Sequence, residues 1–292
     1  MRGRIIKGIA GFYYVFAEDG ETYACKAKGI FRLTGIKPLV GDYCEIDITD
    51  TKDMEGSINA IIPRKSELIR PNVSNVDQAL IVFSVTYPEP NLMMLDKLLL
   101  QYALNGLSSV ICFSKTDLAD ENSIFELKEV YEHSSYPTVF ICSINGEGIP
   151  ELKELLKGRT TSLAGPSGVG KSTLINCLQD KIYSETGSLS RKTERGKQTT
   201  RHSEIIPIDQ ETFIMDTPGF SSFELFGMDP WDLSAYYPEF DTGFECYYSP
   251  CSHTHEPGCK IKEAVENGEI NKTRYQNYSA IFEELKERKR RF

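Results

Sequence analysis

Residues 165–172, GPSGVGKS, have the residue types and spacing of a phosphate-binding loop, G-x-x-x-x-G-K-[ST]. Glycines let a backbone wrap closely around phosphate with its N–H groups pointing inward, and a following helix N-terminus adds a favourable dipole. Lys171 is expected to reach the outer phosphates of a nucleoside triphosphate, and Ser172 to ligate Mg²⁺. A chance glycine-rich loop is disfavoured because every fixed position is filled. The candidate contacts are Gly165, Ser167, Gly168, Val169, Gly170, Lys171, Ser172 and Thr173.

A second motif, DTPG at residues 216–219, follows an apolar run and is typical of a switch II (Walker B) segment. The Asp216 carboxylate would hold the Mg²⁺ shell through water, and the Gly219 N–H would contact the γ-phosphate. The basic, glycine-containing segment 193–202 lies where switch I must be. There Thr200, or its neighbour Thr199, would bind around Mg²⁺ and the γ-phosphate. We expect this segment to become ordered only with the triphosphate.

Two short stretches could read the nucleotide base. SKTD at residues 114–117 resembles the guanine-reading motif N-K-x-D, in which the carboxylate of Asp117 would accept both guanine N1–H and N2–H₂. The Lys115 stem would cover the base. Ser114 replaces the usual Asn, so it can hydrogen-bond across to the phosphate loop but cannot offer the base an amide. The stretch 142–144, with Ser143 at its centre, resembles the S-A-K loop that supports guanine O6 through backbone N–H groups.

The order of these motifs is more informative than any one of them. In ordinary small GTPases the phosphate loop comes first and the guanine readers last. Here residues 114–117 and 142–144 precede residues 165–172, and residues 216–219 come last. This is the arrangement of a circularly permuted GTPase, and it makes switch II run directly into the C-terminal region.

A cluster of cysteines and histidines suggests a metal centre. Cys246, Cys251, His253 and Cys259 supply three thiolates and an imidazole within fourteen residues, which suits a closed tetrahedral Zn²⁺ site. A ligand set that uses His255 in place of His253 is the alternative. Three buried cysteines with surface histidines would also give the pattern, but the density of ligands argues against this.

The composition is that of a globular chain of two or three domains. The longest apolar runs are too short for a membrane span and there is no signal-peptide pattern, so we expect a cytoplasmic protein without disulfides. The five cysteines outside the cluster are expected to be small buried hydrophobes.

Although the net charge is −9, basic residues gather near the N-terminus, in segment 191–201 and at residues 288–291. Solvated faces are the usual fate of such runs, but three of them make RNA contact plausible. The first group consists of Arg2, Arg4, Lys7, Lys26, Lys28, Arg32 and Lys37.

The elements that must position these residues fall into three predicted domains. Residues 1–64 carry about five short strands with glycine kinks, which favours a small OB-fold β-barrel. Tyr13, Tyr14 and Tyr23 there could stack bases, but core positions are favoured. Residues 65–222 begin with a linker at about 63–74. Strands then alternate with helices, which predicts a doubly wound, mainly parallel α/β sheet. Residues 223–292 hold the cysteine cluster and two helices, 261–266 and 275–291.

Taken together, these residues resemble the RsgA family, the circularly permuted GTPases of bacteria that depend on the small ribosomal subunit. The resemblance spans the whole chain, from the barrel through the nucleotide motifs to the Cys/His signature. It implies GTP hydrolysis stimulated by the 30S subunit, a role in late 30S maturation, and RNA contacts from the barrel and the zinc domain. The family usually has Asn at 114 and a switch I His where this chain has Gln198. Gln198 can still orient water but cannot titrate near neutrality, and Phe220, which follows the DTPG motif, cannot orient water.

Our leading hypothesis is a slow GTPase that binds GTP/GDP, Mg²⁺ and one Zn²⁺, contacts the 30S subunit and its 16S rRNA, and works as a monomer away from membranes. Lys171, Gln198 and Thr200 are its candidate catalytic residues. The alternative is a nucleotide-regulated RNA-binding module with negligible turnover. An ATP-using enzyme is disfavoured by Asp117.

Overall fold

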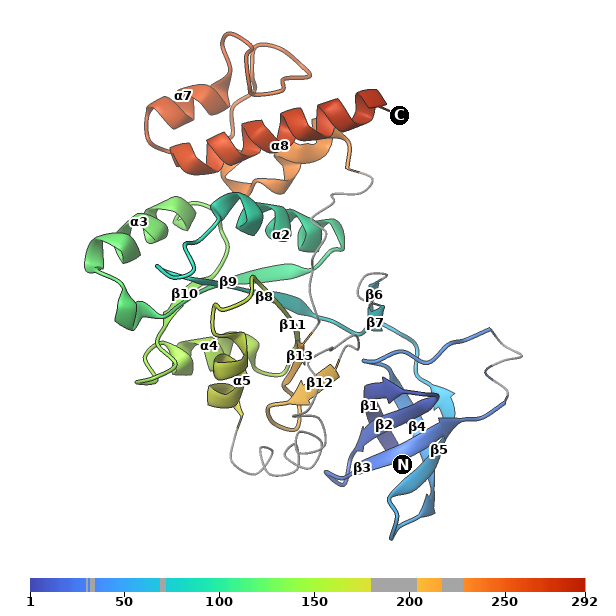
Figure 1. Ribbon diagram of the computed structural model, residues 1–292. Coiled ribbons are helices and arrows are strands. Elements are labelled where there is room, and N and C mark those ends of the chain that lie inside the picture. Colours follow the sequence, from blue (N-terminus) through green and yellow to red (C-terminus); the bar gives the residue numbers. More distant parts are fainter. Residues whose placement is uncertain (30, 32–34, 69–71, 180–203, 217–227, 292) are drawn as a thin grey trace. The chain divides into compact units, whose positions relative to one another are not determined.

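The computed structural model describes residues 1–29, 31, 35–68, 72–179, 204–216 and 228–291 (Figure 1). Their contacts divide the chain into two compact units. The first draws on residues 1–80, 149–164 and 171–220, and the second on residues 81–148, 165–170 and 221–292. Within the described ranges, no helix is both long enough and apolar enough to span a membrane.

The N-terminal strands close into a five-stranded barrel with the order β1-β2-β3-β5-β4. All of its pairings are antiparallel except β3 with β5, so the expected OB-like barrel is confirmed. Ile5, Val15 and Ile58 fill its interior together with Cys25 and Cys44. The strands are β1 (Arg2–Ile9), β2 (Phe12–Ala17), β3 (Thr22–Ala27), β4 (Tyr43–Asp50) and β5 (Glu55–Ile61).

The tyrosines and basic residues that the sequence singles out in the barrel differ in how far they are buried. Tyr23 is buried, as expected, whereas Tyr13 and Tyr14 are half-buried. The prediction that Arg4 belongs to an exposed basic patch is wrong, because its side chain is only 2% exposed. Lys7 is also largely covered and lies 3.5 Å from the Glu204 carboxylate. Counting basic residues along the sequence therefore overestimates the positive charge on the surface of the barrel.

The segment after the barrel is more structured than the predicted linker. It contains a two-stranded antiparallel sheet of β6 (Glu67–Leu68) and β7 (Val73–Ser74). The Arg64 guanidinium donates to both oxygens of the fully buried Asp42, at 2.7 and 2.8 Å. Two parallel charge-assisted bonds of this kind fix geometry, so the segment is held against the barrel.

Within the described residues, six strands form the central sheet, in the order β10-β9-β8-β11-β13-β12. β10 pairs parallel with β9 and β11 parallel with β13, whereas β12 is antiparallel to β13. Every residue of β8 and of β11 is buried, as expected for strands covered on both faces. The mainly parallel α/β sheet is thus confirmed. Its strands are β8 (Gln78–Ser84), β9 (Ser108–Ser114), β10 (Thr138–Ile141), β11 (Thr160–Ala164), β12 (Glu204–Pro207) and β13 (Phe213–Asp216).

Helices and short 3₁₀ turns connect these strands. α2 (Leu92–Leu104) and α3 (Glu121–Tyr131) begin at the side-chain caps Asn91 and Asp120, which accept from the N–H groups of Met94 and Ser123. α3 therefore begins directly after its cap, Asp120. The remaining helical elements are η1 (Thr116–Leu118), α4 (Ile149–Leu156), α5 (Lys171–Leu178), η2 (Pro230–Tyr236), η3 (Pro238–Phe240), α7 (Lys260–Glu266) and α8 (Lys272–Arg291).

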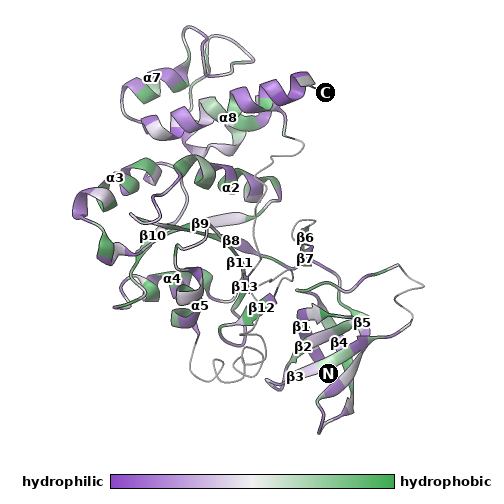
Figure 2. Ribbon diagram, in the orientation of Figure 1, coloured by the Kyte–Doolittle hydropathy of each residue, from purple (hydrophilic) through white to green (hydrophobic). Residues whose placement is uncertain are grey.

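In the second unit, α8 lies against α2 and α3 (Figure 1). Apolar and polar stretches alternate along α3 and α8, as expected of helices with one buried side (Figure 2). The α2–α8 contact is also polar. Arg274 of α8 pairs with the buried Asp96 of α2, and its Nε donates to Glu239 at 2.7 Å. Asp96 accepts in addition from Tyr131 at 3.0 Å and from Asn277 at 2.7 Å.

We predict that Arg274→Met destabilises the second unit by about 3–5 kcal/mol, because it leaves two buried carboxylates without their shared cation. Arg288→Met is the matched control on the same helix, since Arg288 is partly exposed and lies 3.9 Å from Glu284. The control should change the free energy of unfolding by about 0.5 kcal/mol or less. Urea unfolding followed by circular dichroism measures both. Equal stability of the two variants would show that the pairing of Arg274 with Asp96 is not structural.

Candidate nucleotide site and metal centre

The phosphate loop follows β11 directly and leads into α5. Gly165, Gly168 and Gly170 have φ angles of +134°, +83° and +94°, a region that side-chain-bearing residues rarely adopt. A Cβ on Gly165 would lie 2.0 Å from the carbonyl oxygen of Val82. These glycines are therefore required by the backbone path, which is the property that the motif predicts.

The base-reading stretch is tied to this loop by hydrogen bonds. The hydroxyl of Ser114, which is 3% exposed, donates to the carbonyl oxygen of Val169 at 2.6 Å. The Lys115 ammonium donates to the carbonyls of Gly168 at 2.7 Å and Tyr87 at 2.8 Å. Ser114 thus makes the contact to the phosphate loop expected of it. The sequence does not predict the contact between Lys115 and Tyr87, because Tyr87 makes it through its backbone carbonyl, a group that every residue has.

The two predicted base readers lie beside each other. Ile141 of β10 is in register with Ser114 of β9, so the segments that follow the two strands are neighbours. The Cys142 thiol donates to Asp117 Oδ1 at 3.3 Å, and Asp117 itself is exposed. The exposed carboxylate is therefore oriented from one side and open to a ligand on the other. Ser143, the next residue, is half-buried.

At the other end of the loop, Lys171 and Ser172 begin α5. Burial lowers the pKa of Lys171, and the negative charge of Asp216 opposes that shift. Asp216 ends β13 in register with Leu163 of β11, two residues before the loop begins. Ser172 and Thr173 are exposed. A half-buried ammonium with a carboxylate in its field suits the outer phosphates of a magnesium-bound nucleotide.

Several predicted residues lie outside the described part of the chain. They are Gln198 and Thr200 of the predicted switch I, and Gly219 and Phe220 of the predicted switch II.

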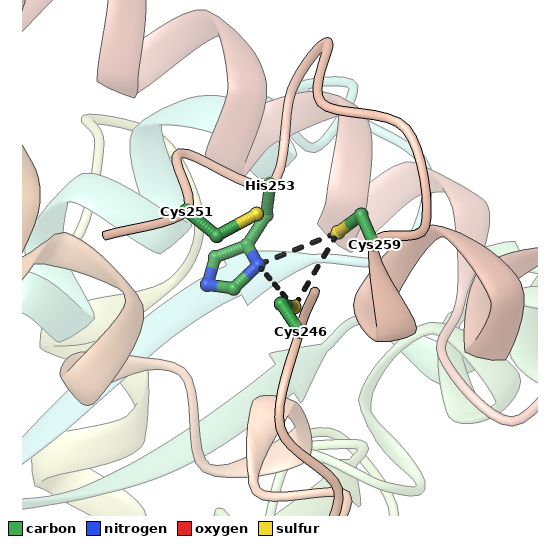
Figure 3. A group of neighbouring side chains, drawn as sticks. All are labelled: Cys246, Cys251, His253 and Cys259. Atoms are coloured by element: carbon green, nitrogen blue, oxygen red, sulfur yellow. Dashed lines mark hydrogen bonds between the residues drawn. The ribbon is translucent and has the colours of Figure 1, made fainter. Parts of the chain in front are cut away.

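The four predicted zinc ligands converge (Figure 3). Their ligand atoms all lie within 4.8 Å of one another. The His253 Nδ1 atom is 3.5 Å from the sulfurs of both Cys246 and Cys259, which are 3.9 Å apart. Tetrahedral Zn²⁺ with bonds of about 2.0–2.3 Å requires ligand–ligand separations of roughly 3.5–3.8 Å. The cluster therefore has the donor set and nearly the dimensions of a structural zinc site.

The surrounding groups select His253 over His255. The tyrosine hydroxyls of α8 hold the loop backbone: Tyr275 donates to the His253 carbonyl and Tyr278 to that of Ser252, each at 2.9 Å. His255 is exposed, and its Nδ1 faces the Thr254 hydroxyl at 2.9 Å. Burial lowers the pKa of His253, which favours the neutral imidazole that a metal requires.

Sequence models of two families match this chain. One, described as RsgA GTPase, matches residues 61–226, and the other, described as RsgA N-terminal domain, matches residues 2–58. Proteins named small ribosomal subunit biogenesis GTPase RsgA align along the whole chain. That of Agathobacter rectalis is 50% identical over 99% of this chain and 100% of its own length. That of Alkaliphilus metalliredigens is 43% identical over 99% of both chains.

Solved structures agree with these sequence matches. The crystal structure of YjeQ from Thermotoga maritima has a TM-score of 0.78 and 37% identity, and covers 97% of this chain and 98% of that one. YloQ, described as a circularly permuted GTPase, has a TM-score of 0.77 and 34% identity, with 98% and 95% coverage. With its barrel, its permuted motifs and its Cys/His cluster, this chain belongs to the RsgA family of circularly permuted GTPases.

Proposed function

We propose that this protein binds the small ribosomal subunit and hydrolyses GTP there during late maturation of that subunit. Family membership supports the reaction and the partner. The observation that carries the nucleotide assignment is the pair of contacts from Ser114 and Lys115 to the phosphate-loop backbone. They join a base-reading segment to a phosphate cradle, which a glycine-rich loop of another kind would not need.

In this proposal, the N–H groups of Gly165 and of residues 167–170 cradle the phosphates, and Lys171 places its ammonium on the outer ones. The hydroxyls of Ser172 and Thr200 ligate Mg²⁺, Thr173 contacts phosphate, and Asp216 holds the metal's water shell. Mg²⁺, when bound, neutralises charge on the β- and γ-phosphate oxygens. Gly219 donates to the γ-phosphate, and Gln198 orients the attacking water.

Guanine is selected by Asp117, and Ser143 supports the base from the neighbouring segment. Cys142 holds the Asp117 carboxylate from behind, while Lys115 stays anchored on the loop carbonyls and lays its stem along the base. This division of work explains how Ser114 can replace the usual Asn. The hydroxyl keeps the contact to Val169 and leaves base recognition to the carboxylate.

We predict that Asp117→Asn weakens GTP binding by about 100-fold, since one hydrogen bond from guanine is lost and the other no longer has a charged acceptor. Binding of xanthosine triphosphate should strengthen, because the new amide can donate to the carbonyl that replaces the guanine amino group. Asp120→Asn is the matched control: Asp120 lies three residues on and caps α3. Equilibrium titration with fluorescent nucleotides measures both, and an unchanged affinity of Asp117→Asn for GTP would exclude this reading. Preference of the wild type for ATP would favour the ATP-using alternative.

Zinc at Cys246, Cys251, His253 and Cys259 would fix the loop that precedes α7, and so stabilise a third domain at about residues 223–292. We retain the other proposed boundaries, 1–64 for the barrel and 65–222 for the GTPase domain. The barrel and the zinc domain would contact 16S rRNA, and exposed Arg290 near the end of α8 offers a basic group for phosphate, whereas the Lys289 ammonium donates to Asp229 at 2.6 Å. The protein would act as a monomer in the cytoplasm, where its partner is assembled.

The test is GTP turnover titrated with purified 30S subunits, under single- and multiple-turnover conditions. We expect slow intrinsic hydrolysis that rises severalfold or more and saturates with the subunit. A GTP turnover rate that does not change when the subunit is added would contradict the proposed coupling. Tight GTP binding with no hydrolysis in either condition would favour the alternative, an RNA-binding module that uses nucleotide only as a ligand.

A further inference from the structure

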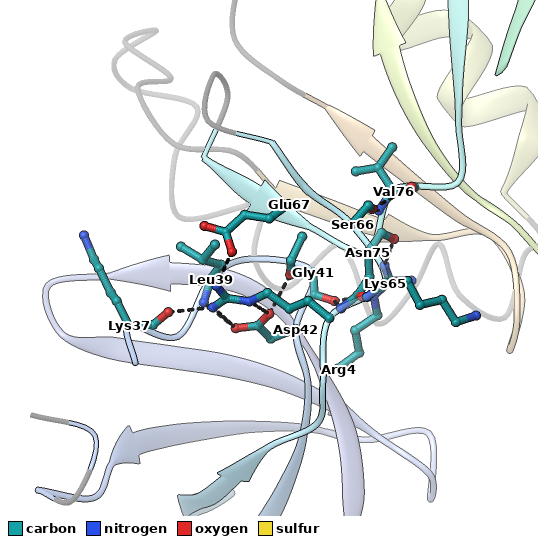
Figure 4. Close-up of polar contacts among 12 residues, drawn as sticks. Arg4, Lys37, Leu39, Gly41, Asp42, Lys65, Ser66, Glu67, Asn75 and Val76 are labelled. Carbon is teal, nitrogen blue, oxygen red and sulfur yellow. Dashed lines mark hydrogen bonds and ion pairs between the residues drawn. The ribbon is translucent and has the colours of Figure 1, made fainter. Parts of the chain in front are cut away.

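One buried arginine of the barrel reaches the strands that carry the nucleotide motifs. Arg4 lies on β1, yet its Nη1 donates to the Thr160 hydroxyl of β11 at 2.6 Å. Its Nη2 donates to the Asn75 carbonyl at 2.9 Å, and its Nε to the Gly41 carbonyl at 3.3 Å (Figure 4). Its guanidinium carbon lies 4.6 Å from the centre of the Phe213 ring, on β13. These residues all belong to the first compact unit.

The two strands that Arg4 touches are those that end at the nucleotide motifs. Thr160 and Phe213 are partners in the parallel register of β11 and β13. At the far ends of the same strands, β11 leads into the phosphate loop at Gly165 and β13 ends at Asp216. Four residues of strand span about 13 Å. A paired strand is stiff along its length, so displacement of the Thr160–Phe213 pair moves both motifs together.

The contact is costly to break and is supported on the barrel side. Arg4 is 2% exposed, so a shift of the barrel alone would leave a buried guanidinium without its acceptors, which is strongly unfavourable. Gly41, which accepts from Arg4, is followed in the chain by the buried Asp42. The Asp42 carboxylate accepts from Arg64 and from Ser74. A Cβ on Gly41 would lie 2.0 Å from the Ser74 carbonyl oxygen. The barrel end of the contact therefore has little freedom to adjust.

We propose that Arg4 is a positioning residue that couples engagement of the barrel by the small subunit to the phosphate loop and Asp216. This inference rests on the proposed function. The inference is that two events are energetically coupled through the Arg4 contact. Binding of the barrel to the subunit stabilises the GTP-bound arrangement of the two strands, and that arrangement strengthens binding of the barrel. By thermodynamic reciprocity, the subunit must then bind more tightly to the GTP-analogue form than to the GDP form, and part of that difference must depend on Arg4.

Arg4→Lys tests the coupling, since lysine keeps the charge but cannot make the forked contacts. Thr160→Val removes the Nη1 acceptor at nearly constant volume and is a second, independent variant. Arg2→Lys is the matched control, because Arg2 is the exposed first residue of the same strand. We would measure intrinsic turnover, subunit-stimulated turnover, and the ratio of subunit dissociation constants with GDP and with a non-hydrolysable GTP analogue. Thermal unfolding checks that each variant folds.

Both Arg4→Lys and Thr160→Val should lower the affinity ratio and the stimulated rate by about fivefold or more, within the usual range of allosteric coupling. Intrinsic turnover should stay within about twofold of wild type, and Arg2→Lys should behave as wild type. Folded variants that keep the wild-type ratio would overturn the inference. So would a parallel fall of intrinsic and stimulated rates, which would mean that Arg4 only maintains the fold. A wild type that does not respond to the subunit would instead refute the proposed function.

Discussion

Replacing Lys171 by alanine is expected to reduce GTP hydrolysis by on the order of 10²–10³-fold, the effect of removing one preorganised group that stabilises developing charge. Burial lowers the pKa of this lysine, and the Asp216 charge opposes the shift. When bound phosphates add further negative charge, the ammonium is favoured more strongly and its position becomes fixed. The loss should appear in nucleotide affinity as well as in the catalytic constant. Single-turnover hydrolysis and equilibrium nucleotide binding measure the two effects separately.

The matched control is Lys157→Ala. Lys157 lies after α4, its side chain is 72% exposed, and its ammonium is 3.8 Å from Glu154. Its removal should leave hydrolysis within about twofold of wild type, because exposed pairs of this kind contribute little. If Lys171→Ala hydrolysed GTP at the same rate as Lys157→Ala, the assignment of residues 165–172 as the phosphate cradle would be wrong.

Replacing Cys251 by serine should abolish stoichiometric zinc binding and unfold the loop between residues 246 and 259. Structural zinc sites contribute about 10–16 kcal/mol of apparent binding free energy, and loss of one of four ligands removes much of it. The cluster also touches the apolar core of this region: the His253 ring lies 6.0 Å from the Phe240 ring, and Cys259 is itself buried there. We therefore expect the effect to extend to η3 and α8. Metal analysis after gel filtration gives the zinc content directly.

The chain's single tryptophan provides a second readout of that change. Trp231 of η2 packs edge-on against Phe282 of α8, with ring centres 5.6 Å apart. Both Cys251→Ser and chelation of the wild type should shift its fluorescence to longer wavelength as this contact loosens. Cys177→Ser removes a thiol outside the cluster and should retain zinc and the wild-type spectrum. One full equivalent of zinc in Cys251→Ser, with an unchanged spectrum, would refute the ligand set.

The metal cluster shows how far short-range sequence can reach. Four ligands within fourteen residues define the chemistry, because any fold of so short a segment keeps them close. The sequence also favours His253, with His255 as the alternative. What holds His253 toward the thiols is not local: Tyr275 and Tyr278, about twenty residues further along the chain, donate to the loop backbone.

The base-reading segment shows the same division. The carboxylate of Asp117 and the departure at Ser114 are visible in the sequence. That Ser114 bonds to Val169, 55 residues away, follows only from the packing of the two loops. Cys142 was counted among buried hydrophobes and is buried, yet its thiol also donates to Asp117. The sequence shows that such a side chain can form a hydrogen bond, but it does not show which residue is the partner.

Charge patterning was the least reliable guide. Arg4 stands in a basic stretch and was expected at the surface, but it is buried with an acceptor 156 residues away. A buried ion or guanidinium needs partners on every side, and such partners are gathered from distant segments that no local pattern reveals.

The sequence by itself determined where the candidate chemistry of this protein lies: a phosphate-binding motif, predicted base readers placed before it, a predicted switch acid after it, and a Cys/His cluster that could hold a metal. Each is encoded in a few consecutive residues, because phosphate, guanine and zinc each demand particular groups at short spacing. The tertiary structure decided which polar groups serve the site and which hold the strands in place. That choice depends on burial and on partners far apart in sequence, which exist only once the chain has folded.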